Sequence, residues 1–153
     1  MKWVVAIALA MGTAHAEPGF FAAAGAGANV SHPLGELRVG RRFQGAPFFE
    51  LSLAYSYDAA ISELPFQTLG LAARTYVGHV WALEIYSEAT ASLALSGSGK
   101  FADRAIGDRL LGGMLTVGVG AAYAIDPCWS VTLALATGTP VWLRSELAVQ
   151  RRF

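Results

Sequence analysis

The last part of the chain, residues 141–153, alternates between two kinds of side chain. One parity is mainly apolar and contains Val141, Leu143, Ser145, Leu147, Val149, Arg151 and Phe153. The other is mainly polar and contains Trp142, Arg144, Glu146, Ala148, Gln150 and Arg152. Because successive side chains of a β-strand point to opposite faces, this pattern predicts a strand with different solvents on its two sides. No adjoining helix or sheet pattern is available to cover the apolar side.

The same alternation recurs between clusters of turn-forming residues and predicts an all-β chain of eight strands. Gly, Pro, Asn and Asp mark the breaks because they tolerate the backbone conformations of turns. A strand that crosses a membrane needs about 9–11 residues. The predicted strands are 19–29, 35–44, 48–57, 65–77, 80–95, 108–124, 128–137 and a last one that starts at 141. Gly78 and His79 are expected to form the tight turn between the fourth and fifth strands.

Membrane helices are the alternative, because residues 110–125 and 127–143 carry no charge. Both stretches are shorter than the about 20 residues that a membrane-spanning helix requires, and Gly138 and Pro140 interrupt the second. In segments such as residues 36–39, charges fall at every second position, so they would face one way on a strand but spiral towards lipid on a helix. We therefore favour an antiparallel up-and-down transmembrane barrel over an inner-membrane helical protein.

The N-terminal segment has the organisation of a secretory signal peptide. Lys2 is followed by an apolar run, and Ala14 and Ala16 are small residues at the positions that a signal peptidase reads. We expect cleavage after Ala16, which makes residues 1–16 a signal peptide and residues 17–153 the barrel domain.

Composition agrees with a membrane protein. Charged residues make up 14% of the chain and the mean hydropathy is +0.44, whereas soluble domains contain about 25% charged residues. The formal net charge is zero, which gives no reason to expect a nucleic-acid partner. Cys128 is the single cysteine, so no internal disulfide can form.

The polar parity of the predicted strands collects acids and bases in equal number. Charges in a narrow lumen are costly unless they are paired, and the interior of an eight-stranded barrel is just wide enough for side chains to fill it. We expect a polar plug, with a narrow ion path as the alternative. The predicted lumen charges are Glu36, Arg38, Arg42, Glu50, Arg74, Glu84, Glu88, Arg144, Glu146 and Arg152; Gln67, Tyr76, Thr116, Thr132 and Gln150 are predicted beside them.

The apolar parity places aromatic residues at the strand ends, as expected of rings that sit at the two interfaces of a bilayer. Arg41 is the charged exception on this face, and it can extend towards lipid head groups. The predicted girdles are Phe43, Phe49, Trp81, Tyr123, Trp129 and Phe153 at the periplasmic rim, with Tyr55 and Tyr57 at the outer rim.

These features together resemble the small eight-stranded OmpA/OmpX-type outer-membrane barrels over residues 17–153. The likeness rests on the signal-like start, the alternating strands, residues 118–131 and the Val-Gln-Arg-Arg-Phe ending. It implies a barrel in the bacterial outer membrane, surrounded by lipid, with both termini in the periplasm. It also implies that the last strand, through Leu147, Val149 and Phe153, is the signal read by the barrel-assembly machinery. The likeness leaves activity open, because fold does not determine function.

Two functional alternatives follow from the predicted outer loops. A lipid A-modifying hydrolase or acyltransferase would need a nucleophile and a base, and Ser31, His32, Asp58 and Ser62 are the nearest candidates, although no catalytic motif matches. Glu84 and Glu88 would lie about 13 Å apart on one strand, which is too far for a catalytic dyad. We therefore assign no catalytic, metal or cofactor site. The loop at residues 96–107 is a candidate site for a protein partner.

Overall fold

The computed structural model describes residues 19–29, 32–43, 48–58, 64–101, 104–106, 113–139 and 143–153. These residues form an antiparallel sheet that closes into an eight-stranded barrel, with one further short strand attached to it. The strands are β1 (Phe20–Asn29), β2 (His32–Phe43), β3 (Phe49–Asp58), β4 (Leu64–Val80), β5 (Leu83–Phe101), β6 (Arg104–Ile106), β7 (Gly113–Ala124), β8 (Trp129–Thr139) and β9 (Arg144–Arg152).

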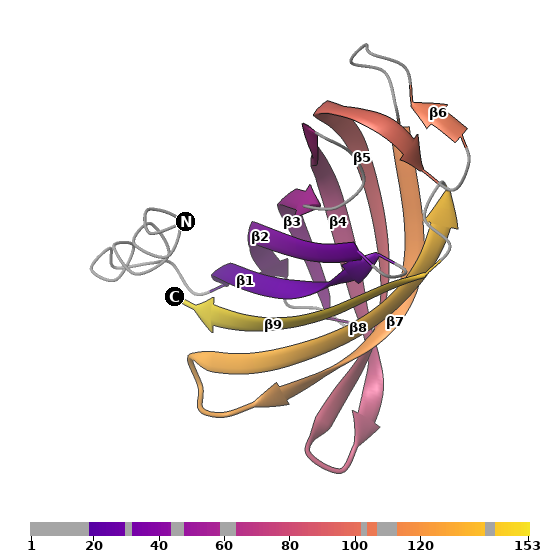
Figure 1. Ribbon diagram of the computed structural model, residues 1–153. Coiled ribbons are helices and arrows are strands. Elements are labelled where there is room, and N and C mark those ends of the chain that lie inside the picture. Colours follow the sequence, from indigo (N-terminus) through magenta and orange to yellow (C-terminus); the bar gives the residue numbers. More distant parts are fainter. Residues whose placement is uncertain are drawn as a thin grey trace.

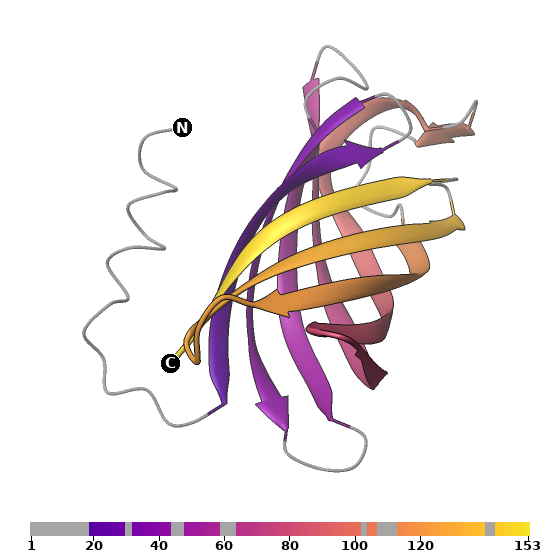
Figure 2. The same cartoon turned by 90° about the horizontal axis from the view of Figure 1, so that it is seen from below.

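Pairing between the first and last strands closes the barrel. Phe21 lies opposite Arg152 and Asn29 lies opposite Arg144, so β1 begins at the end of the barrel where β9 ends. We call this end the terminal rim and the other end the opposite rim. Figures 1 and 2 show β1 and β9 side by side in the wall. The short strand β6 pairs only with the far part of β5, and this hairpin lies beyond the ends of the neighbouring strands (Figure 1).

The predicted fold class is confirmed, and strands cover most of the two uncharged stretches that raised the helical alternative. The described residues include no helix that is long and apolar enough to cross a membrane. The predicted turn at Gly78 and His79 is wrong. Both residues belong to β4, which has an irregularity between Tyr76 and Gly78 and then continues its pairing with β5. The chain turns instead at Trp81 and Ala82, where Trp81 has a positive φ of 56°.

The two faces of the wall have opposite chemistry. Inward positions are buried and many are polar; the Glu50 side chain, for example, is 1% exposed. Outward positions are apolar and exposed, with Leu71 at 58% and Val119 at 62%. This arrangement is the inverse of a soluble sandwich, where the apolar faces are covered. The wall therefore presents a continuous apolar surface to its surroundings.

Small residues on the inner face make room for large ones. Tyr86 of β5 is completely buried, and its hydroxyl donates a hydrogen bond to the Leu133 carbonyl at 3.3 Å. Its ring lies against Gly120 of β7, where an added Cβ would overlap the Cζ and hydroxyl of Tyr86. The Tyr76 ring packs against Tyr86 with centroids 5.6 Å apart. Tyr86 belongs to the inner parity of its strand, and its role was missed by the sequence analysis.

Candidate functional site in the barrel lumen

The centre of the lumen holds a cluster in which Arg38 contacts three carboxylates. Its Nη1 and Nη2 donate to Glu88 at 2.5 and 2.9 Å. It also donates to Glu36 on its own strand and, at 3.3 Å, to Glu146. Arg144 donates to Glu36 and, at 3.1 Å, to Glu146. Side chains from β2, β5 and β9 thus form one hydrogen-bonded cluster.

Arg74 of β4 extends this cluster to a further set of polar residues. Its Nε donates to Glu88 Oε2 at 2.5 Å. Its Nη1 lies 4.0 Å from Glu50 Oε2 and donates to Gln150 Oε1 at 3.5 Å. The Gln150 amide in turn donates to Glu50 Oε1 at 3.2 Å. All four side chains are buried or nearly so, so the network continues across the full width of the lumen.

Arg42 completes the described network near the terminal rim. Its Nη2 donates to both oxygens of Glu84, at 3.2 and 3.4 Å. Its guanidinium also lies 4.4 Å from the centre of the Tyr76 ring, as Arg74 lies 4.6 Å from that of Tyr86. Stacking on these rings positions the arginines while their edges remain available to carboxylates.

Arg152 lies outside this network. It was predicted with the other lumen charges, and its position on β9 has the inward parity of Gln150. Its Nε is buried without a hydrogen bond, and it forms no ion pair with any carboxylate in the part of the chain that the structure describes. Its backbone N–H donates to the Cys128 carbonyl at 2.7 Å. Arg152 therefore secures the strand end through its backbone.

A glycine on β1 creates the space for the central cluster. A Cβ added at Gly25 would lie 2.9 Å from Glu146 Oε1 and 2.9 Å from the Ala148 Cβ. Any larger residue at this position would displace the Glu146 carboxylate from its arginines. The glycine-rich inner face of β1 thus allows charges from β2 and β9 to meet across it.

The network has the chemistry of a structural plug. Each of its carboxylates contacts at least one arginine, which offsets the cost of removing the charges from water. The outward-aimed exception is Glu50 Oε2, which is buried without a hydrogen bond although Arg74 lies within ion-pair distance. The described residues contain no group of three or more His, Cys, Asp or Glu side chains arranged to hold a metal ion.

The aromatic residues predicted at the rims lie at the two ends of the barrel. Phe43 stacks on Phe49 with ring centroids 4.9 Å apart. Trp81 lies in the turn of the terminal rim and is 96% exposed. The terminal rim holds Phe43, Phe49, Trp81, Tyr123, Trp129 and Phe153, whereas Tyr55 and Tyr57 lie towards the opposite rim.

One polar residue was predicted on the wrong face of the wall. Gln67 was expected in the lumen, but it lies opposite Tyr57 on the outward side. It accepts a hydrogen bond from the Tyr55 hydroxyl at 2.7 Å. The register of β4 shifts between Gln67 and Thr68, which moves Gln67 out of the strand's regular alternation.

The residues of the expected assembly signal lie on the outer face of β9. Leu147 is 56% and Val149 45% exposed. The Phe153 N–H donates to the Phe20 carbonyl at 2.9 Å, which continues the pairing between the two ends of the chain. The last aromatic residue is therefore fixed against the first strand.

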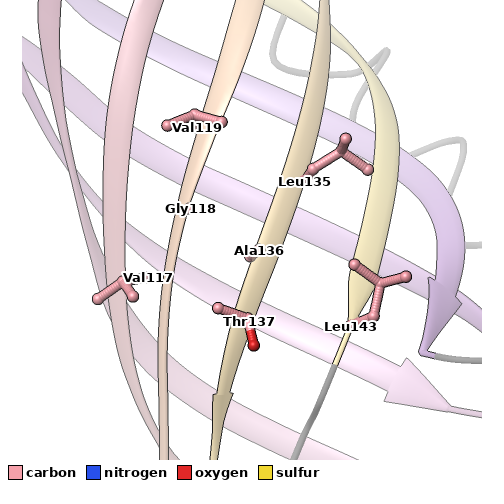
Figure 3. Close-up of a pocket in the computed structure, with 7 residues that line it drawn as sticks. All are labelled: Val117, Gly118, Val119, Leu135, Ala136, Thr137 and Leu143. Atoms are coloured by element: carbon pink, nitrogen blue, oxygen red, sulfur yellow. The ribbon is translucent and has the colours of Figure 1, made fainter.

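An apolar groove crosses the outer face between β7, β8 and the start of β9 (Figure 3). Its volume is about 410 Å³. The Thr137 hydroxyl is the one side-chain polar group among its lining residues, which are Val117, Gly118, Val119, Leu135, Ala136, Thr137 and Leu143. Such a lining suits a hydrocarbon chain and supplies neither a carboxylate nor an imidazole for acid–base chemistry.

The predicted catalytic alternative falls largely outside the described part of the protein. Ser31 and Ser62 lie outside the described residues, and so do the side chains of His32 and Asp58. The predicted partner loop at 96–107 contains the β5–β6 hairpin, of which the backbone alone is described. Both ideas stay predictions.

Solved structures share this architecture at low sequence identity. The N-terminal barrel domain of Pseudomonas aeruginosa OprF aligns with a TM-score of 0.68 and 16% identity, covering 90% of this chain and 98% of that one. A de novo designed transmembrane β-barrel gives 0.60 and 13%, with 90% and 98% covered. The outer-membrane enzyme PagL gives 0.54 and 16%, with 87% and 98% covered.

Neither a protein-family model nor a curated protein matches the sequence. The structural neighbours include an enzyme and a designed barrel, so the shared fold carries no particular activity. At the level of fold, the expected likeness to the small eight-stranded outer-membrane barrels is confirmed: the chain folds as a closed antiparallel barrel of that kind.

Proposed function

We propose that this protein is an integral outer-membrane barrel with a structural or surface-interaction role and no enzymatic activity. The observation that carries the proposal is the inverted wall, with ion pairs buried inside and apolar side chains exposed outside. Exposed side chains such as Leu133, Leu135 and Val117 form part of this outer surface. Soluble proteins rarely leave so large an apolar surface open to water. A lipid bilayer is the solvent that removes this cost, since a closed barrel also satisfies its backbone hydrogen bonds internally.

We propose further that the lumen is plugged by its own side chains. Arg38, Arg74 and Glu88 meet near the centre, and Tyr86 and Gln150 occupy the neighbouring space. A wide aqueous channel needs many more strands than eight. The plug supports a role in which the barrel acts through its surface and not as a general porin.

A non-enzymatic role is favoured by where the titratable groups lie. The described carboxylates of the lumen are engaged with arginines, and the outer groove is lined by apolar groups and one threonine hydroxyl. An acyl-transfer site would need a nucleophile, a base and an orienting group together beside the lipid. The proposed surface role is assigned to the opposite rim, where the β5–β6 hairpin extends from the wall.

The native cysteine provides a test of location and orientation. Cys128 is exposed in the turn between β7 and β8, at the terminal rim. If this rim faces the periplasm, a polymer-linked maleimide too large for porins should label Cys128 only after the outer membrane is permeabilised. The matched variant Cys128→Ser/Thr139→Cys carries its thiol at the opposite rim and should be labelled in intact cells.

Fractionation of the same cells completes this test. We expect the folded protein in the outer-membrane fraction, with heat-dependent migration on gels. Labelling of Cys128 in intact cells would reverse the proposed orientation, and recovery of the protein with the inner membrane would contradict the proposed location.

A further inference from the structure

Two arginines face outward at the terminal rim, in a wall that is otherwise apolar. Arg41 lies on β2 and Arg151 on β9, one on each side of β1. Among the described side chains of the barrel wall, these are the two charged residues at regularly paired outward positions. A charge on this face needs an anionic partner or access to water, because hydrocarbon does not solvate it.

Aromatic rings hold both arginines in place. The Arg41 guanidinium lies 5.4 Å from the centre of the Phe20 ring and 5.6 Å from that of Phe43. Arg151 lies 5.4 Å from the Trp129 ring and 5.1 Å from the Phe153 ring. These contacts use the flat face of the guanidinium, so the N–H groups along its edge remain available to an oxyanion.

Neither arginine is neutralised by a carboxylate in the described part of the chain. The ion pairs of the described residues involve Arg38, Arg42, Arg74 and Arg144. The Nε of Arg151 is buried without a hydrogen-bond partner. The exposed Arg41 and the half-buried Arg151 therefore retain donor capacity that the protein itself does not use.

The register brings the two arginines to a common site. Arg41 lies opposite Phe20, and Arg151 lies opposite Ala22 on the other edge of β1. Neighbouring strands are about 4.8 Å apart and each residue rises about 3.3 Å, so the two Cα atoms are separated by about 12 Å. Long, flexible side chains at this distance can approach one anion from both sides. The outer face of β1 between them consists of alanines, which leaves a shallow path along the wall below the anion.

We propose that Arg41 and Arg151 form a binding site for the phosphate of an anionic phospholipid. Guanidinium groups match the geometry of phosphate oxygens and donate paired hydrogen bonds to them. The apolar residues around the site, such as Val39 and Val149, suit the acyl chains of a membrane lipid and not a free phosphate. The proposal rests on the proposed membrane location, and on the periplasmic orientation of this rim, which would place the site in a phospholipid leaflet.

The test measures lipid selectivity in symmetric bilayers. The refolded protein is placed in bilayers of equal phosphatidylglycerol and phosphatidylcholine, and native mass spectrometry counts the lipids that remain bound. We expect the wild type to retain phosphatidylglycerol preferentially. Arg151→Gln should lower this preference about fivefold, and Arg41→Gln/Arg151→Gln should lower it by about that factor again.

Arg152→Gln is the matched control, because it removes the same charge from the adjacent residue on the inward side. It should leave the preference unchanged, and Arg41→Lys/Arg151→Lys should keep part of it. An equal loss in Arg152→Gln, or no loss in the double glutamine variant, would overturn the site. Gel mobility verifies that each variant is folded. A symmetric bilayer makes the result independent of orientation in cells, so reversed Cys128 labelling would contradict the proposed orientation and leave the lipid site standing.

Discussion

Replacing Arg38 with leucine is expected to lower the free energy of unfolding by about 3–5 kcal/mol. Arg38 is 3% exposed and contacts Glu36, Glu88 and Glu146. Its removal leaves these carboxylates with Arg74 and Arg144 as their remaining partners. The excess negative charge then stays in a lumen where water cannot solvate it fully. Urea unfolding of the barrel in lipid vesicles, followed by fluorescence, measures the change.

Arg42→Leu is the matched control for this prediction. The Arg42 side chain is 14% exposed and its partner Glu84 is 25% exposed, so water compensates for part of the lost interaction. We expect a clearly smaller destabilisation. Adding Glu88→Gln to Arg38→Leu should recover part of the loss, because it removes one of the uncompensated charges. Equal effects of Arg38→Leu and Arg42→Leu would show that burial of the network does not determine its contribution.

The same proteins test the proposed plug. In planar bilayers we expect the wild type to give no steady conductance of the size seen for wide aqueous channels, because the described network fills the lumen. A persistent open channel in the wild type would contradict the plug, even if the stability differences were found.

Replacing Leu133 with arginine is expected to destabilise the barrel in bilayers by about 2–4 kcal/mol. Leu133 is 52% exposed on the outer face of β8, opposite Ala121 and Leu147 and away from both rims. If the wall is surrounded by lipid, the new charge lies in hydrocarbon and must be carried towards the interface. Unfolding titrations in vesicles of fixed lipid composition give the size of the effect.

Tyr123→Arg provides the comparison for this substitution. Tyr123 also faces outward and is 49% exposed, but it lies at the terminal rim next to the end of β7. A charge there reaches the interface directly, and we expect a cost of about 0–1 kcal/mol. Equal costs at Leu133 and Tyr123 would contradict the proposed position of the bilayer around the wall.

The alternation of side chains was sufficient to predict most of the architecture. In β9, Arg144 and Glu146 alternate with exposed residues such as Leu147 and Val149. The period of two assigns each of them to a face without knowledge of their partners. The prediction failed where a local irregularity changed the alternation. Gln67 lies at such a shift in β4, and Gly78 follows another, so a turn signal at Gly78 did not end the strand.

The strand β1 shows what local sequence could not establish. Its residues are mainly alanine and glycine, which have low intrinsic preference for strands. It is extended because both of its edges are paired, with β2 on one side and β9 on the other. That pairing joins segments more than a hundred residues apart and depends on closure of the whole sheet.

The sequence by itself determined which residues face the lumen and which face outward, because that choice follows from parity along each strand. The tertiary structure alone decided which charges meet. Arg144 reaches Glu36 across β1, and Arg38 reaches Glu88 from a strand far along the chain. It also placed Arg41 and Arg151 around one site at the terminal rim. Such contacts depend on register, curvature and closure, which are properties of the assembled barrel and not of any single strand.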